Sequence, residues 1–363
     1  MHQPDFRTEI KKYLEDLLGT IIKVEYIGPI NKDEATSEDL KEFGYGKNLL
    51  IEFRVNGELK SYILSTMNKN KFGHYFFYDR AKTLLLAHSC YNKLPQHVKS
   101  IDVGAFTGER KFKSAGNCKE FFILREKVEG DLYYLDLDRI KETNKISELD
   151  RKRAIALAKY LAKIHSKKSD EGSLYIRRIR QLVGHGECIM GLTDSYPPDI
   201  EFTIQKELET IEKKCIEWRY KIKKKKDRLC QVHGDFHPWN ILFREGVDFS
   251  IIDRSRGEWG EAADDVTSIT INYLFYAIQY DNKIRENFLK LFRLFWDTYL
   301  EETHDFEMLS LVAPFYAWRG LVIASPIWYP DLNSQVRRKI FDFILNVLSR
   351  DKFNLDSIVE MFE

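Results

Sequence analysis

The sequence has few cysteines, no excess of charge of either sign and no uninterrupted apolar run long enough to cross a membrane. Its five cysteines are widely spaced and include no C-x-x-C pair, which argues against a disulfide framework or a zinc ribbon. Lys and Arg number 57 against 56 for Asp and Glu, so no global field attracts nucleic acid or anionic lipid. The most apolar stretch, residues 311–328, contains two prolines and an arginine. We therefore expect a cytoplasmic protein with reduced thiols and with neither a nucleic-acid nor a membrane partner.

The 363 residues are 44% hydrophobic and 13% aromatic, which is enough to bury a sizeable core and to form two lobes. Residues 1–18 have the pattern of an amphipathic helix, and residues 21–28 that of a strand. Two alternating runs, residues 48–55 and 58–66, flank Asn56-Gly57, the strongest short signal for a β-hairpin. The chain therefore begins with a helix and a small antiparallel sheet.

A helical segment at residues 79–92 and a further strand pair at 100–106 and 120–128 complete this β-rich part. From residue 147 the pattern becomes helical, with a serine cap and apolar residues three and four apart. Long helices are expected at 147–165, 201–226 and 336–348. We predict an α+β fold of two lobes: a small antiparallel β-sheet lobe at residues 1–126 and a larger, mainly helical lobe at residues 127–363.

The most informative stretch runs from residue 231 to 253 and reads QVHGDFHPWNILFREGVDFSIID. With a four-residue turn at 245–248, it forms a hairpin in which Ile241 pairs with Ile252 and Asn240 lies opposite Asp253. An amide and a carboxylate at one end of a ladder offer few ligands, which suits Mg²⁺ completed by waters and nucleotide phosphates. We therefore predict that Asn240 and Asp253 bind Mg²⁺.

Asp235 lies five residues before Asn240 in a loop that contains a glycine and a proline. A carboxylate beside a metal-bound phosphate can orient an attacking hydroxyl and accept its proton. Any one of these residues alone is more often an ordinary turn residue. Their combination favours phosphoryl transfer, with Asp235 as the catalytic group.

HGDFHPWN followed by IID resembles the catalytic loop and metal-binding segment of the aminoglycoside phosphotransferase and choline kinase family, which has the protein-kinase-like fold. The sequence DRSRGEWGEAADDV continues the resemblance. It implies that Asp235 is the catalytic base, that Asn240 and Asp253 bind Mg²⁺, and that Asp265 braces the loop. His233 and His237 are expected to support the loop, since neither has a second metal-type residue at a suitable spacing.

The family pattern breaks at the third strand, where a lysine usually holds the nucleotide phosphates and pairs with a glutamate on the next helix. The equivalent position here is Ser65, Lys60 points to the opposite face of the strand, and helix 79–92 has no glutamate. Cations for the phosphates of ATP or GTP are instead expected from Lys41 and Lys47, next to the sequence FGYG. The expected nucleotide-binding residues are Lys47, Lys41, Ser65, Glu126 and Val128.

Three residues are expected to contact the acceptor: Glu187, Asp194 and Arg319, the last because an arginine in an apolar stretch needs an anionic partner. His185 and Glu187 form an H-x-E pattern, but no P-C-x-x-C follows, so a zinc deaminase is rejected. We expect a small-molecule kinase that uses Mg²⁺ and ATP or GTP to phosphorylate a hydroxyl of an aminoglycoside, amino alcohol or sugar. The alternative is a pseudokinase that binds nucleotide or acts as a scaffold without phosphotransfer.

Overall fold

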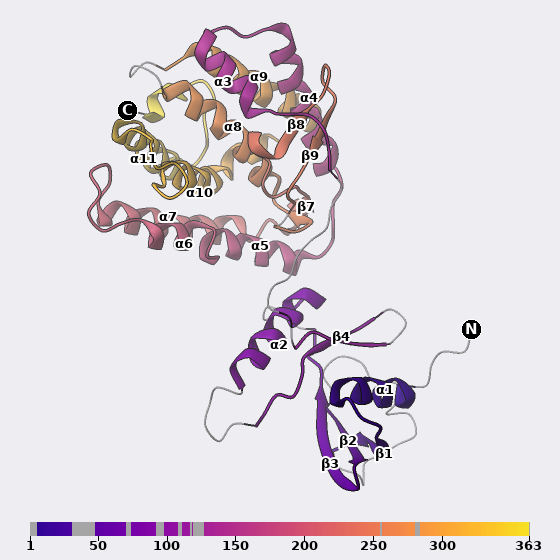
Figure 1. Ribbon diagram of the computed structural model, residues 1–363. Coiled ribbons are helices and arrows are strands. Elements are labelled where there is room, and N and C mark those ends of the chain that lie inside the picture. Colours follow the sequence, from indigo (N-terminus) through magenta and orange to yellow (C-terminus); the bar gives the residue numbers. More distant parts are fainter. Residues whose placement is uncertain are drawn as a thin grey trace. The chain divides into compact units, whose positions relative to one another are not determined.

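The computed structural model describes residues 6–30, 48–69, 74–91, 98–107, 111–116, 118, 127–254, 256–279 and 284–362. The chain divides into two compact units, Met1–Arg125 and Glu126–Glu363 (Figure 1). Small antiparallel sheets occur in both units, and helices dominate the second. The described residues therefore have the mixed content, mostly helical with small antiparallel sheets, that the sequence predicts.

A three-stranded antiparallel sheet forms the centre of the first unit, with β2 (Asn48–Val55) between β1 (Lys23–Pro29) and β3 (Glu58–Ser65). The turn between β2 and β3 has φ of 51° at Asn56 and 85° at Gly57. Both values lie in the left-handed region, which asparagine and glycine enter most easily. The predicted hairpin is confirmed.

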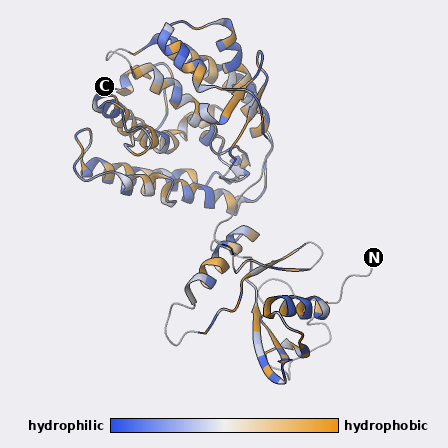
Figure 2. Cartoon of the chain, in the orientation of Figure 1, coloured by the Kyte–Doolittle hydropathy of each residue, from blue (hydrophilic) through white to orange (hydrophobic). Residues whose placement is uncertain are grey.

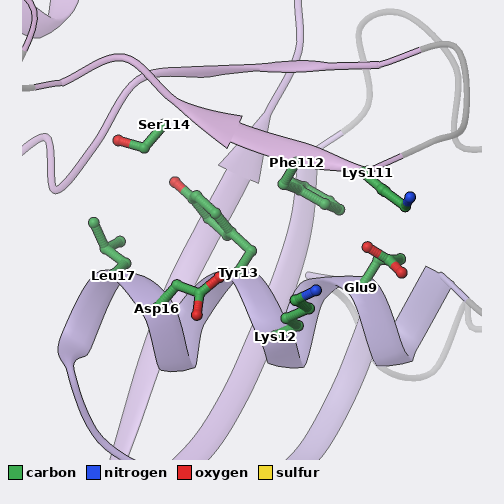
Figure 3. Close-up of a pocket in the computed structure, with 8 residues that line it drawn as sticks. All are labelled: Glu9, Lys12, Tyr13, Asp16, Leu17, Lys111, Phe112 and Ser114. Atoms are coloured by element: carbon green, nitrogen blue, oxygen red, sulfur yellow. The ribbon is translucent and has the colours of Figure 1, made fainter.

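Helix α1 (Phe6–Leu18) packs on one face of this sheet. Apolar residues alternate along β2, so that their side chains meet those of α1 in one cluster: Ile10, Leu14, Leu49, Ile51, Phe53 and Val55. The Tyr13 ring of α1 also stacks on Phe112, with centroids 5.2 Å apart. Beside this contact, a pocket of about 390 Å³ opens between α1 and β5 (Figure 3).

The rest of the first unit contains α2 (Phe77–Tyr91) and a two-stranded ladder of β4 (Gly104–Phe106) with β5 (Phe112–Ser114). Part of the strand expected at 100–106 thus forms β4, which pairs with β5. Residues 120–126 of the second strand expected, at 120–128, lie outside the described residues.

Nine α-helices make up most of the described part of the second unit: α3 (Tyr134–Thr143), α4 (Glu148–His165), α5 (Gly172–Gly184), α6 (Ile189–Ser195), α7 (Gln205–Ile222), α8 (Ala262–Ile278), α9 (Glu286–Thr303), α10 (Ala313–Ala324) and α11 (Ser334–Ser349). Ser147 caps α4 as expected, since its Oγ accepts a hydrogen bond from Asp150 N at 3.2 Å. Helix α8 is buried along nearly its whole length and packs against α9 and α10. It forms the centre of this unit.

No helix of the described residues is long and apolar enough to cross a membrane. The apolar stretch at 311–328 forms only the 12-residue helix α10. Figure 2 shows hydrophilic residues interspersed with hydrophobic ones along the helices of the second unit.

Short strands in the second unit hold the stretch that the sequence singled out. Strand β8 (Ile241–Phe243) lies between β6 (Asp131–Leu132) and β9 (Phe249–Ile251), and β7 (Cys230–Gln231) pairs with β10 (Trp259–Gly260). Residues 232–240 of this stretch therefore leave β7 and enter β8, so both ends of this loop are fixed by sheet pairing.

The predicted register of the β8–β9 hairpin is wrong by one residue, because Ile241 pairs with Ile251 and not with Ile252. The turn has three residues between Arg244 and Asp248 instead of four: Arg244 N donates to Asp248 O at 2.8 Å. Gly246 within it has φ of 66°, a conformation that glycine adopts readily.

The shorter turn changes what lies opposite Asn240. Its carbonyl accepts a hydrogen bond from Ile252 N at 3.0 Å, and Asp253 follows one residue later. Asp253 has φ of 60°, so the chain leaves the extended conformation there. The cross-strand pairing predicted for Asn240 and Asp253 is therefore not formed.

Candidate active site

Asp235 lies in the loop between β7 and the 3-10 turn Pro238–Asn240. Gly234 before it has φ of 87°, and a Cβ there would stand 3.0 Å from the Cβ of Arg256, so glycine is favoured for two reasons. His237 begins the turn, where its Nδ1 accepts a hydrogen bond from Trp239 N at 3.3 Å. The loop is thus held in a tight conformation by local contacts.

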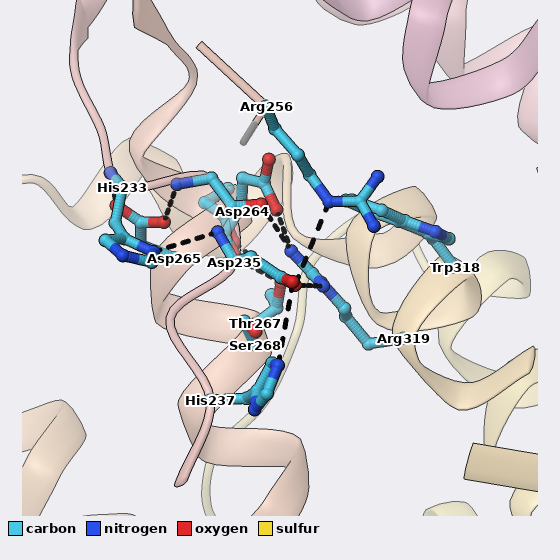
Figure 4. Close-up of polar contacts among 12 residues, drawn as sticks. His233, Asp235, His237, Arg256, Asp264, Asp265, Thr267, Ser268, Trp318 and Arg319 are labelled. Carbon is cyan, nitrogen blue, oxygen red and sulfur yellow. Dashed lines mark hydrogen bonds and ion pairs between the residues drawn. The ribbon is translucent and has the colours of Figure 1, made fainter. Parts of the chain in front are cut away.

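Asp265, near the start of α8, fixes the backbone of this loop by hydrogen bonds. Its two oxygens accept hydrogen bonds from His233 N and Gly234 N, each at 2.7 Å (Figure 4). His165 Nε2, at the end of α4, lies 3.2 Å from the same carboxylate. Burial by itself would raise the pKa of Asp265, but these partners lower it. Asp265 is fully buried and ionised. His165 supports it, a role that the resemblance of the segment LAKIH (161–165) to the family did not assign.

The His233 ring lies between the loop and the end of β9. Its Nδ1 accepts a hydrogen bond from Asp235 N at 3.2 Å, and its Nε2 lies 3.0 Å from the carbonyl oxygen of Ile252. A carbonyl can only accept, so Nε2 carries the proton and the ring is neutral. Burial lowers the pKa of His233, which favours the same neutral form. His233 therefore joins the Asp235 loop to the residue before Asp253.

Three cationic or polar groups surround the Asp235 carboxylate. Arg319 Nη1 donates to Oδ1 at 2.6 Å, Arg256 Nε lies 3.9 Å from Oδ1, and His237 Nε2 lies 3.6 Å from Oδ2. Burial opposes ionisation, but His237 and the two guanidinium groups together hold the pKa of Asp235 well below its usual range. We attribute most of this effect to Arg319, because His237 lies beyond hydrogen-bond distance.

Arg319, on α10, joins two carboxylates. Its Nη2 donates to Asp264 Oδ1 at 2.6 Å and to the carbonyl oxygen of Gly234 at 3.0 Å, while the guanidinium carbon lies 3.8 Å from the centre of the Trp318 ring. Burial raises the pKa of Asp264 to about 6, against the opposing charge of Arg319. The arginine thus has the anionic partners that its apolar setting requires, and one of them is Asp235.

The predicted metal ligands differ in exposure. Asn240 is buried, and its Nδ2 donates to the carbonyl oxygen of Asp235 at 3.0 Å and lies 3.1 Å from His237 Nε2, so both contacts use the nitrogen of the amide and not its oxygen. Asp253 is exposed, one residue beyond the partner of Asn240. Within the described ranges, no three His, Cys, Asp or Glu side chains form a metal-binding group. One amide oxygen and one carboxylate fit Mg²⁺, which keeps several waters and phosphate ligands.

The residues expected to bind nucleotide are only partly described. Ser65 ends β3 and is exposed, and Lys60, opposite Phe53 in the ladder, is exposed as well. Val128 is exposed in the second unit. The other three expected residues, Lys41, Lys47 and Glu126, lie outside the described residues.

Of the residues expected to contact the acceptor, Glu187 and Arg319 are joined to the Asp235 cluster, and Asp194 is exposed on α6 without a described contact to it. Glu187 Oε2 accepts from Arg256 Nη1 at 3.0 Å, and the Glu187 carbonyl accepts from Trp318 Nε1 at 2.9 Å. Arg256 is the member of the cluster that the sequence patterns missed. Its position three residues after a metal-ligand candidate was the available signal.

The sequence profile described as the phosphotransferase enzyme family matches residues 113–301. Among solved structures, the chain is similar to amicoumacin kinase, with 14% identity, 99% of this chain and 100% of that chain covered, and a TM-score of 0.42. It is also similar to choline kinase from Streptococcus pneumoniae, with 12% identity and a TM-score of 0.34; the match covers 94% of this chain and 98% of the choline kinase chain.

Glucosamine kinase is a further similar structure, with 16% identity and a TM-score of 0.34. That match covers 64% of this chain and 58% of the glucosamine kinase chain, which is less than two thirds of its length. No curated protein sequence matches the chain.

Proposed function

The chain belongs to the phosphotransferase enzyme family, whose profile matches just over half of its length, and we propose that it transfers the γ-phosphoryl group of ATP or GTP to a hydroxyl of a small molecule. The observation that carries this proposal is the Asp235 loop. An ionised carboxylate lies there beside two arginines, and the buried Asn240 amide donates to the backbone carbonyl of the same residue. The same membership supports a two-lobe, protein-kinase-like arrangement, with residues 1–126 binding nucleotide and residues 127–363 carrying the acceptor and the catalytic loop.

Asp235 orients the acceptor hydroxyl in this mechanism. Because Arg319 already donates a hydrogen bond to Asp235 Oδ1, Asp235 Oδ2 is the oxygen that accepts the hydrogen bond from the acceptor hydroxyl. A carboxylate with a lowered pKa is a weak base, but the transition state of phosphoryl transfer is loose and the proton leaves late. The acceptor oxygen bonds to the γ-phosphorus, the bond to the β,γ-bridging oxygen breaks, and the proton passes to Asp235 as the nucleoside diphosphate leaves.

Asn240 and Asp253 are the residues that would hold Mg²⁺, through the amide oxygen and the carboxylate. Bound Mg²⁺ supplies positive charge to the phosphates of the nucleotide. Lys41, Lys47, Ser65, Glu126 and Val128 remain our proposed nucleotide contacts.

The test is turnover of γ-labelled ATP with Mg²⁺ and a metabolite extract. We expect a labelled product with the wild-type protein and a loss of about 10²-fold or more with Asp235→Asn, since positioned acid-base groups contribute about 10²–10⁴-fold. Asp248→Asn, which changes an exposed carboxylate in the β8–β9 turn, is the matched control. Nucleotide binding without any product would favour the pseudokinase alternative, and equal turnover by Asp235→Asn would remove Asp235 from the mechanism.

A further inference from the structure

Arg256 stands beside the reacting carboxylate without being hydrogen-bonded to it. It follows Asp253 by three residues, and its Nε lies 3.9 Å from Asp235 Oδ1. Its guanidinium carbon lies 4.9 Å from the centre of the Trp318 ring, and Figure 4 shows the two side chains next to each other. A hydroxyl bound to Asp235 is therefore within reach of a second, already positioned cation.

The main cation that holds Asp235 ionised is not Arg256, which contributes from 3.9 Å. Arg319 already does this at 2.6 Å, and Arg319 is itself paired with Asp264. The described ion-pair partner of Arg256 at hydrogen-bond distance is Glu187, whose side chain is 66% exposed. An exposed ion pair is screened by water and contributes little, so an anionic ligand can take the place of Glu187.

Two guanidinium nitrogens of this cluster are buried without a hydrogen-bond partner. Among the described residues, the buried side-chain nitrogen and oxygen atoms that lack one are Arg256 Nε, Arg319 Nε and Asn272 Oδ1. Buried polar groups are normally satisfied, and a charged donor without an acceptor is costly. Both arginine atoms belong to side chains that contact Asp235 or lie beside it, so unsatisfied cationic donors gather around this carboxylate.

We propose that the phosphorylated acceptor carries an anionic group, a carboxylate or a phosphate, and that Arg256 binds this group next to the hydroxyl oriented by Asp235. This inference rests on the function proposed above and names its substrate class. The planar guanidinium offers paired donors that match the oxygens of such groups. An ammonium group at the same position would meet the charges of Arg256 and Arg319, while the nearby carboxylates of Asp235, Asp264 and Glu187 are already paired with these two arginines.

The first test separates a metabolite extract by charge into anionic, neutral and cationic fractions and measures transfer from γ-labelled ATP to each. We expect the labelled product from the anionic fraction. A product from the neutral or cationic fraction alone would overturn the inference and leave the kinase assignment intact. No product from any fraction would overturn the proposed function, and the inference with it.

The second test uses the active anionic compound and its uncharged analogue, the carboxamide of a carboxylate or the dephosphorylated form of a phosphate. In Arg256→Gln, we expect the ratio of kcat/KM for the anionic over the uncharged acceptor to fall at least tenfold. Arg244→Gln, an exposed arginine of the β8–β9 turn, should leave the ratio unchanged. An equal loss for both acceptors in Arg256→Gln would show that Arg256 acts on the transferred phosphoryl group, which would overturn the inference.

Glu187→Gln supplies the opposite perturbation at the same place. It removes the carboxylate that competes for Arg256 and leaves the guanidinium in position on Trp318. We expect the KM for the anionic acceptor to stay equal or to fall. A rise in that KM of tenfold or more would mean that Glu187 itself binds the acceptor, as a cationic substrate requires, and would contradict the inference.

Discussion

Replacing Arg319 by methionine should cost more stability than any other single change at the site. Its guanidinium is buried and pairs at 2.6 Å with both Asp235 and Asp264. Removing one partner of a buried ion pair costs about 3–5 kcal/mol, because the remaining charge stays in a poorly solvated position. Since one arginine here serves two carboxylates, we expect the loss in free energy of unfolding to reach this range.

Urea unfolding at neutral pH measures this loss, and a double-mutant cycle assigns it. Adding Asp264→Asn to Arg319→Met removes one of the two carboxylates that have lost their arginine. The double variant should therefore lose about 1 kcal/mol or more less free energy of unfolding than the sum of the two single changes. Arg337→Met is the matched control, since Arg337 is equally buried but donates to carbonyl oxygens such as Ala324 O. A loss below about 1 kcal/mol for Arg319→Met, or no coupling with Asp264, would refute the reasoning.

Three further predictions concern other residues. The pKa of Asp264 is raised to about 6, so its ionisation disfavours the folded state. We therefore expect the stability of the wild type relative to Asp264→Asn to fall as the pH rises from about 4 to about 6 and then to level off. Urea unfolding at each pH measures this difference. Asp265→Ala should lower turnover more than it lowers nucleotide affinity, because it releases the His233 and Gly234 N–H groups that shape the loop; equal effects on both would contradict this. Lys41→Ala or Lys47→Ala should weaken nucleotide binding more than Lys60→Ala does, and calorimetry measures the three affinities. Equal affinities would contradict the proposal that Lys41 and Lys47 contact the nucleotide.

Local patterns were sufficient for much of the fold. The Asn56-Gly57 turn, the alternation along β2 and the Ser147 cap each depend on a few neighbouring residues, and all three form as predicted. The β8–β9 register was missed because the turn is one residue shorter than its sequence suggests. Arg244 and Asp248 close it by a backbone hydrogen bond and an ion pair between their side chains. A difference of one residue in a turn changes every pair in a ladder.

Side-chain partners from distant segments could not be predicted. Apolar surroundings indicated that Arg319 needs an anion, but its partners Asp235 and Asp264 lie 84 and 55 residues away. The only sequence signal for Arg256 was its position three residues after Asp253, and its place beside Trp318 depends on how α10 packs in the second unit. The sequence thus contained the chemical types of the site, while tertiary packing decides which side chains meet.

The most direct test of the central claim is ³¹P NMR of ATP turnover by the wild type and Asp235→Asn, with Mg²⁺ and the acceptor-containing fraction. We expect the wild type to convert the γ-phosphoryl signal into that of a phosphate monoester, and Asp235→Asn to form this product at least about 10²-fold more slowly. A signal of inorganic phosphate alone, or an equal rate of monoester formation by the variant, would contradict the claim that the Asp235 carboxylate directs transfer to a hydroxyl.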